Sequence, residues 1–262
     1  MKRLLRLAVV VLLATSSAHA AAAGSAKRVR AFARLPDWTG LWETELSKAI
    51  TNAAGRSEVF SVGNLGRHPP YNPEWEQKYQ AALSDPVAAE KQANTFKGCG
   101  PGSPEYIRSF PNIMEAPMVF QVVVTPEETL FVMDHGEVRH IYTDGRRHPE
   151  KDDLWPTPLG DSVGHWKGHT LVVDTVARTA GPVSIFGTGE VSEQAHFTEK
   201  VRLIDKNTLE DELTIEDPLR FVHPWTMQLR YSRVRDINRL IPYDCEADRN
   251  PVIDGKLTIS PQ

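Results

Sequence analysis

Two acidic side chains lie in rows of residues that otherwise read as the inner face of a sheet. In the segment AHFTEKVRLID, every second residue from Phe197 to Leu203 is apolar except Glu199. The segment TLEDELTI repeats the pattern, with Asp211 between two leucines. Burial disfavours a charged carboxylate, so such a group takes up a proton or attracts a cation. The two residues therefore predict acid-base chemistry or the polar end of a ligand site.

Other arrangements would account for these carboxylates without chemistry. A buried arginine or histidine would neutralise each charge, and a β-bulge would reverse the phase and turn the carboxylates outward. A water-filled cavity would keep them solvated and within reach of a ligand. The residues leave these alternatives open.

A histidine and a tyrosine share the apolar phase of a hairpin predicted around His135 and Gly136. A two-residue turn there sets Phe131 opposite His140 and puts Tyr142 on the same face. Together with the two carboxylates, they would converge in an apolar interior, where an imidazole and a carboxylate can act as acid and base. The alternative is that the histidine bonds a backbone carbonyl and the tyrosine hydroxyl reaches the rim.

Two further groups carry chemistry of their own. Arg146 and His148, in TDGRRHPE, would hold an anionic or phenolic group at a pocket mouth, or else belong to a solvated turn capped by an aspartate. Asp174 shares the face of His165 if the intervening hairpin turns at Lys167 and Gly168. A His-Asp pair can orient an imidazole for proton transfer, and an outward ion pair is the alternative.

The candidate site residues fall into two sets. The candidate catalytic residues are His140, His165, Asp174 and Glu199. The candidate binding residues are Phe131, Tyr142, Arg146, His148, Phe197, Asp211 and Trp225. Neither a glycine-rich nucleotide motif nor a Cys/His metal signature occurs, so we expect no cofactor and no metal.

The elements that must position these residues are short strands joined by tight turns. Their pattern predicts an all-β fold, an antiparallel meander that forms a lipocalin-like barrel or half-barrel. A small helical insertion is expected at about 73–94, with Trp75, Tyr79 and Leu83 on one face. We expect one domain over residues 37–262.

The start of the chain predicts export. The basic and apolar stretch MKRLLRLAVVVLLATSSAHA is typical of a secretory signal peptide cleaved after Ala20, and a basic flexible arm over 21–36 follows. Nothing later in the sequence is apolar enough for a membrane span. A net charge of -4 without a basic patch argues against nucleic acid as a partner. The expected location is periplasmic or secreted.

Two cysteines fit an oxidising compartment. Cys99 and Cys245 lie in polar, turn-like contexts, and we expect them to form a disulfide that ties the C-terminal tail to the middle of the chain. A loop of that length stabilises a fold by about 4 to 5 kcal/mol in the chain-entropy model. Two unpaired thiols are the alternative.

Several motifs resemble those of a large group of exported, β-rich bacterial proteins. The resemblance is carried by DWTGLW, HIYTDGRRHP, GHWKGHTLVVDT, TEKVRLID and LTIEDPLRFVHPWT. It implies an exported β-rich domain and brings no reaction with it; at His140 it implies a longer basic residue. The Gly-x-Trp that ends at Trp42 is also similar to the start of lipocalin and calycin barrels.

Two function classes follow from these observations. The first is a carrier that holds an apolar small molecule, aromatic or terpenoid-like, inside the barrel. The second is a cofactor-independent lyase, isomerase or hydrolase that acts through His and Glu as acid and base. An imidazole within about 3.2 Å of Glu199 or Asp174, beside an open pocket, favours the enzyme. Carboxylates paired to arginine favour the carrier.

Overall fold

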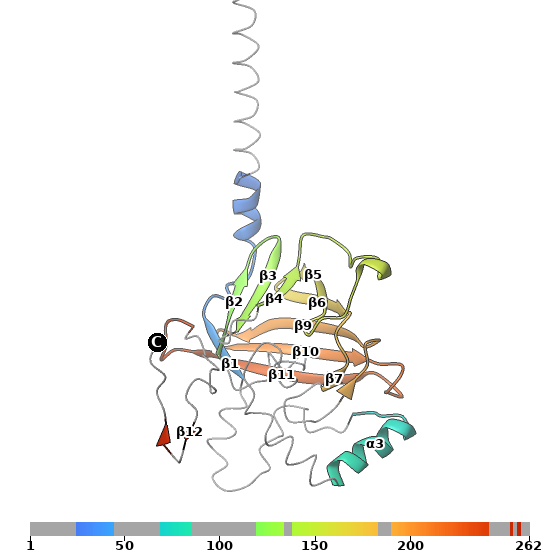
Figure 1. The fold of residues 1–262 in the computed structure, drawn as a ribbon. Coiled ribbons are helices and arrows are strands. Elements are labelled where there is room, and N and C mark those ends of the chain that lie inside the picture. Colours follow the sequence, from blue (N-terminus) through green and yellow to red (C-terminus); the bar gives the residue numbers. More distant parts are fainter. Residues whose placement is uncertain are drawn as a thin grey trace, which may run out of the picture.

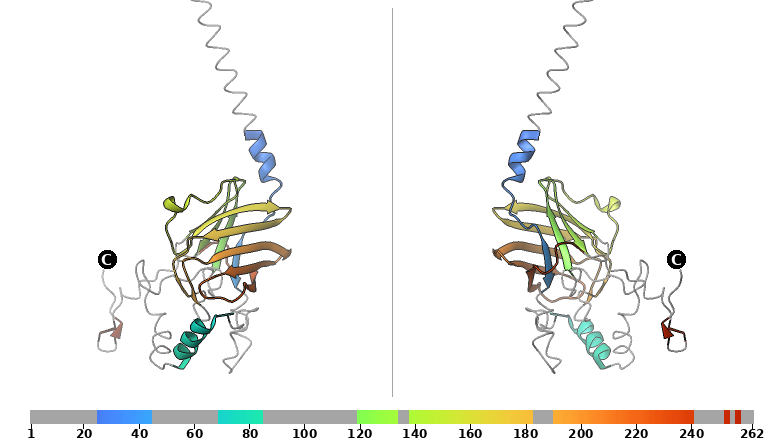
Figure 2. Two further views of the ribbon diagram at one scale, coloured as in Figure 1. Left: turned by 90° about the vertical axis from the view of Figure 1, so that its right-hand side faces the viewer. Right: turned by 90° about the vertical axis from the view of Figure 1, so that its left-hand side faces the viewer.

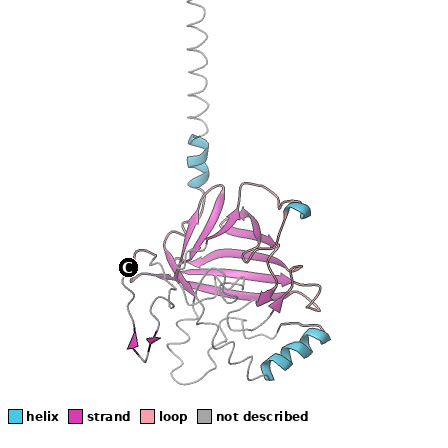
Figure 3. Cartoon of the chain, viewed as in Figure 1, coloured by secondary structure: helices cyan, strands magenta, loops and turns pink. Residues whose placement is uncertain are grey.

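The protein is built around a closed β-barrel, which is the main feature of Figures 1 and 3. The computed structural model describes residues 25–44, 69–84, 119–133, 138–182 and 190–240, and the backbone of 252–253 and 256–257. The barrel strands, in order around the ring, are β1 (Leu41–Thr44), β11 (Trp225–Val234), β10 (Thr208–Glu216), β9 (His196–Asp205), β6 (Thr170–Val176), β5 (Asp161–Lys167), β4 (Val138–Tyr142), β3 (Glu128–Met133) and β2 (Val119–Val124).

Shorter elements surround the barrel. They are the helix α3 (Pro73–Ser84), the 3-10 turn η2 (Lys151–Asp153), and two small ladders, β7 (Gly181–Pro182) with β8 (Glu190–Val191) and β12 (Val252–Ile253) with β13 (Lys256–Leu257). Residues 25–32, within the predicted flexible arm, form a helix that stands on the opposite side of the barrel from α3 (Figure 2). The all-β barrel with a small helical insertion is thus confirmed. The predicted signal peptide, both cysteines and residues 85–94 lie outside the described residues.

The order of strands departs from a plain antiparallel meander at one position. A closed ring whose strands alternate in direction needs an even number of strands, and this ring has nine. At least one neighbouring pair must therefore be parallel, and β4 and β5 form that pair, through Ile141 opposite Ser162 and Tyr142 opposite Val163. Residues 143–160 carry the chain from the end of β4 to the start of β5 and include η2.

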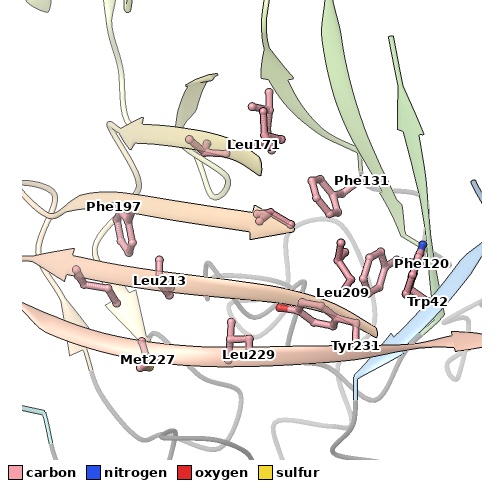
Figure 4. Close-up of a cluster of buried hydrophobic side chains, with 14 of the residues drawn as sticks. Trp42, Phe120, Phe131, Leu171, Phe197, Leu209, Leu213, Met227, Leu229 and Tyr231 are labelled. Atoms are coloured by element: carbon pink, nitrogen blue, oxygen red, sulfur yellow. The ribbon is translucent and has the colours of Figure 1, made fainter. Parts of the chain in front are cut away.

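The inner face of the barrel is largely apolar, and its side chains are buried. Phe131, Phe197, Leu213 and Met227 are each 0% exposed, and Tyr231 is equally buried (Figure 4). These side chains alternate along their strands with outward residues, as the period of two requires. Each large apolar side chain buried in this way stabilises the fold by about 1.5 to 3 kcal/mol.

The segment before β1 packs Trp38 against tryptophans of the barrel. The ring centroids of Trp38 and Trp166 lie 5.1 Å apart in an edge-to-face arrangement, and the Trp42 indole donates a hydrogen bond of 3.0 Å to the Trp38 carbonyl. Arg233 covers the outer side of the Trp42 ring, with Cζ 4.2 Å from the ring centroid. The contact between β1 and β11 thus joins the first strand of the barrel to its last.

Helix α3 begins with a capped turn. The Asn72 side chain accepts a hydrogen bond of 3.1 Å from the Trp75 backbone N–H, and Pro73 occupies the first helical position. Trp75 and Tyr79 lie on one face, as predicted, and both rings contact Tyr71, at centroid distances of 6.5 and 5.5 Å.

Glycines allow two tight turns around β5. The hairpin between β5 and β6 turns at Gly168 and His169, because Lys167 pairs with Thr170; the turn expected at Lys167 and Gly168 is therefore displaced by one residue. Gly168 has φ +63 and nothing within 4 Å of the position a Cβ would take. Gly160 has φ +69, and a Cβ there would lie 2.6 Å from the Val176 carbonyl oxygen.

The packing at Gly160, in the turn before β5, can be tested against Gly168, in the turn after β5, which has the same left-handed backbone and open space around it. Gly168→Ala should lower the free energy of unfolding by about 1 to 2 kcal/mol, the cost of a left-handed residue. Gly160→Ala should cost roughly 3 kcal/mol or more, since a steric clash is added to the same backbone strain. Urea denaturation of both variants measures the difference. Equal losses would show that the close packing at Gly160 does not constrain the turn.

Candidate functional site

A buried arginine spans the inside of the barrel from β4. Arg139 is 1% exposed, and its Nη1 and Nη2 atoms lie 2.9 and 2.5 Å from the two carboxylate oxygens of Glu199 on β9. Its Nη2 also contacts the hydroxyls of Ser162 on β5, at 3.3 Å, and Thr175 on β6, at 3.1 Å. Those hydroxyls lie 2.8 Å from each other. Glu199 therefore faces inward as predicted, and its cation partner is an arginine.

A second carboxyl lies beside this ion pair. Asp211 is 0% exposed and sits opposite Val201 on β9, one step along the inner face from Glu199. Burial raises the pKa of Asp211 well above its ordinary value of 3.8, and the negative charge of Glu199 raises it further. Arg139 opposes this shift without cancelling it. Burial and the charge of Glu199 therefore both favour the protonated, neutral form of Asp211, which lies next to the ion pair.

Asp211 keeps an acceptor that no described residue uses. Among the described residues, none donates a hydrogen bond to either of its oxygens. The acid proton can be donated to Glu199, because that interaction also raises the pKa of Asp211. The carbonyl oxygen is then left without a donor in an apolar interior, and a buried acceptor of this kind costs about 1 to 3 kcal/mol.

A chain of alternating carboxylates and imidazoles runs across the outer face of the barrel. The ring of His148 lies between Asp161 and Asp174, with Nδ1 2.5 Å from Asp161 Oδ1 and Nε2 2.9 Å from Asp174 Oδ1. The ring of His196 lies between Asp174 and Glu216, with nitrogen to oxygen distances of 2.9 and 3.3 Å. The five residues, which we call the outer chain, come from residues 143–150 and from β5, β6, β9 and β10.

The geometry of the outer chain favours the protonated form of His196. Both nitrogens of this ring face carboxylate oxygens, and an ionised carboxylate only accepts hydrogen bonds, so the ring makes both contacts at once only as an imidazolium. The hydrogen bond to Asp174 raises the pKa of His196 above 6.5, and the bond to His196 lowers the pKa of Asp174 below 3.8. The groups are partly exposed, so each pair contributes little to stability on its own.

The predicted inward histidine and tyrosine point outward instead. Phe131 pairs with Arg139, and Leu130 with His140, so the register differs by one residue from the one expected. A one-residue shift exchanges the two faces of a strand. His140 contacts Glu128 at 3.1 Å and stacks on Tyr142, with ring centroids 6.0 Å apart. The shift that removes them from the interior also brings Arg139 into it.

The turn that carries Arg146 follows the solvated alternative. Its backbone N–H and its guanidinium both donate to Asp144, and Arg146 Cζ lies 3.9 Å from the centroid of the Tyr142 ring. Arg146 therefore stays on the outside of the barrel. His148, two residues later, joins the outer chain.

His165 shares the outer face with Asp174, as predicted, but the two do not pair. Its side chain is exposed and lies opposite Val172. The partners of Asp174 are His148 and His196. His196 was not among the predicted residues, since the contact between β6 and β9 joins strands that are not neighbours in sequence.

The remaining predicted binding residues belong to the core. Phe131 and Phe197 are fully buried, and Trp225 is 4% exposed, with its ring edge-on to Phe221 at 5.8 Å. Within the described ranges, no group of three or more His, Cys, Asp or Glu side chains is arranged to hold a metal ion. No helix in the described part of the chain is long and apolar enough to cross a bilayer.

Comparison with known proteins does not assign the site. No protein-family model matches the chain, and a search of curated proteins finds no match either.

The inner ion pair can be tested by removing one partner or both. Arg139→Met leaves Glu199 uncompensated and should lower the free energy of unfolding by about 3 to 5 kcal/mol. The double variant Arg139→Met, Glu199→Met removes both charges and should cost clearly less. Urea denaturation measures both. A double variant no more stable than the single one would contradict the burial of an uncompensated charge.

The outer chain predicts a particular dependence of stability on pH. The raised pKa of His196 means that its contribution is complete below pH 6.5 and is lost as pH rises through the raised value. In Asp174→Asn, the pKa of His196 should fall toward 6.5, as followed by NMR titration of the imidazole ring. Glu128→Gln, beside His140, is the control and should leave His196 unchanged. A His196 pKa that is insensitive to Asp174→Asn would refute the assigned pairing.

Proposed function

We propose that this barrel binds an apolar small molecule that carries one hydrogen-bond donor. The proposal is supported by one observation above the others: Asp211 presents an acceptor that no described residue uses, inside a largely apolar barrel. A buried polar group without a partner destabilises the folded protein, so its presence calls for an explanation outside the fold itself. A ligand donor, such as a hydroxyl or amine, supplies the missing hydrogen bond.

The surroundings of Asp211 suit such a ligand. Leu209 and Leu213 flank it on β10, and the facing strand β11 contributes Leu229 and Met227. Aromatic rings of Phe131 and Tyr231 line the same interior (Figure 4). Apolar walls with a few placed polar groups are the usual composition of a small-molecule site. An aromatic or terpenoid-like molecule fits this lining.

The ion pair beside Asp211 favours a neutral ligand over a cationic one. Arg139 neutralises Glu199, so the interior presents a dipolar group in place of an uncompensated negative charge. A cationic ligand therefore gains less from this interior than a neutral one with a donor. We further propose that the protein acts after export, as its first 20 residues predict.

A second candidate function is acid catalysis without a cofactor. It is favoured by the raised pKa of Asp211 beside the ion-paired Glu199, because two adjacent carboxyls whose surroundings push their pKa values apart are typical of acid and base pairs. Asp211 would donate its proton to a bound molecule in a lyase, isomerase or hydrolase reaction. His140 and His165 point away from the interior and take no part in this version.

Mass spectrometry separates the two candidates. Small molecules released from the purified protein are identified and then incubated with it again. A molecule recovered unchanged supports binding, and one that is converted by the protein but not by an Asp211→Asn variant supports catalysis.

The binding proposal can be tested with N-phenyl-1-naphthylamine, an apolar fluorescent probe that carries one N–H donor. Asp211→Leu removes the acceptor and should weaken probe binding about tenfold, while leaving stability equal or higher, since a buried unsatisfied group is lost. Asp211→Asn keeps a carbonyl acceptor and should bind within a few-fold of the wild-type protein. Fluorescence titration and urea denaturation measure the two quantities.

The control is Glu212→Gln, which alters the outward neighbour of Asp211 on the same strand and should leave the probe affinity unchanged. Absence of probe binding by the wild-type protein, or full affinity in Asp211→Leu, would refute the proposal.

A further inference from the structure

The barrel has one short seam. The parallel strands β4 and β5 pair over two residue positions, whereas each of the other neighbouring barrel strands pairs over three or more. Parallel pairing is also slightly less stable per residue than antiparallel pairing. Among the described strands of the barrel, β4 and β5 therefore share the shortest backbone pairing.

Side chains cross this seam on the inside. Arg139 starts on β4, and its guanidinium reaches Ser162 on β5, Thr175 on β6 and Glu199 on β9. The strand before the seam is thus tied to three strands beyond it. This tie carries a buried arginine, whose charge does not change at physiological pH.

Side chains also cross the seam on the outside. His148 follows β4, and its ring binds Asp161 at the start of β5 and Asp174 on β6. His196 extends the same chain from Asp174 to β9 and β10. The Arg139 network on the inner face and the outer chain on the outer face therefore both cross the boundary before β5, and both extend to β6 and β9.

We propose that the seam between β4 and β5 is the opening through which the apolar ligand reaches the barrel interior, and that the outer chain is a pH-dependent latch on it. This inference rests on the proposed binding function. It also explains how a ligand reaches side chains that are closed to water in the structure, such as Phe197 and Asp211.

The latch is closed in acid and weakens in alkali. His148 is faced by Asp161 and Asp174, with Arg146 of its own segment near Asp161; His196 is faced by Asp174 and Glu216. Loss of a proton from either ring removes one donor, so one contact to a carboxylate is lost. For His196, whose pKa is raised, the contact is complete below pH 6.5 and is lost above the raised value. Protonation of Asp174, whose pKa is lowered, releases it only below pH 3.8.

Stopped-flow association of N-phenyl-1-naphthylamine tests the latch. The association rate of the wild-type protein should rise about fivefold from about pH 6 to about pH 9, as expected for loss of one partly exposed ion pair. His148→Gln should show the faster rate already at the lower pH and lose the pH dependence. His169→Gln alters an exposed histidine in the β5–β6 turn and should behave like the wild type. A His148→Gln variant with wild-type rates and pH profile would overturn the latch.

A covalent cross-link tests the seam directly. Tyr142→Cys with Val163→Cys puts a disulfide between the outward pair of β4 and β5. When oxidised it should abolish probe association, and a reductant should restore it. The control, Val172→Cys with Lys200→Cys, bridges β6 and β9 and should leave association unchanged under both conditions. Peptide mapping verifies each bridge. Undiminished association through a cross-linked seam would refute the proposed opening.

Hydrogen exchange separates this inference from the proposed function. Backbone amides of β4 and β5 should exchange faster in His148→Gln than in the wild type, with no ligand present. If the wild type binds no probe at any pH, the binding function fails. Suppose instead that the probe binds, that His148→Gln does not speed up exchange, and that neither the cross-link nor pH alters probe association. Binding then stands and the seam inference fails.

Discussion

A ring of nine strands cannot alternate in direction all the way round, and this constraint shapes the rest of the molecule. One pair has to be parallel, and a parallel pair needs a long connection from the end of one strand to the start of the next. Residues 143–160 supply that connection, and the pairing they lead to is short. The Arg139 network inside the barrel and the outer chain outside it both cross this boundary. Side-chain interactions there supplement the few backbone hydrogen bonds that join β4 to β5.

The two networks differ because their surroundings differ. Arg139 and Glu199 lie where water is absent, so their attraction is strong and each charge depends on the other. The same dry environment raises the pKa of Asp211 and so favours its neutral form. His148, Asp174 and their partners lie in the outer wall, where solvent weakens each pair and mild changes of pH change the charge of an imidazole. One face of the wall therefore carries a permanent contact and the other an adjustable one.

How far the sequence predicts this arrangement depends on the range of each contact. The inward positions of Glu199 and Asp211 follow from alternation within a single strand, which is local. The inward position of Arg139 does not follow from the sequence in the same way. The β3–β4 register differs by one residue from the one expected, and the pairing at the turn decides which residues of the strand face the interior. The partnership of Asp174 and His196 arises where β9 lies beside β6, and no neighbouring sequence indicates that pairing. The parallel pair follows from the odd number of strands in the ring. No single segment of the sequence shows that number or shows that the ring closes.

The junction of β1 with β11 joins strands from opposite ends of the domain, so it forms late in folding. Leu41 pairs with Val234, so the two partners are separated by almost the whole length of the domain. Contacts between such distant positions form slowly, because the ends of a long loop must first meet. If the chain is exported from its N-terminus, as its first 20 residues predict, β1 emerges before β11 and its edge facing β11 stays unpaired until that strand follows. During that interval an exposed edge is open to pairing with other chains, and a chaperone that covers strand edges would protect it.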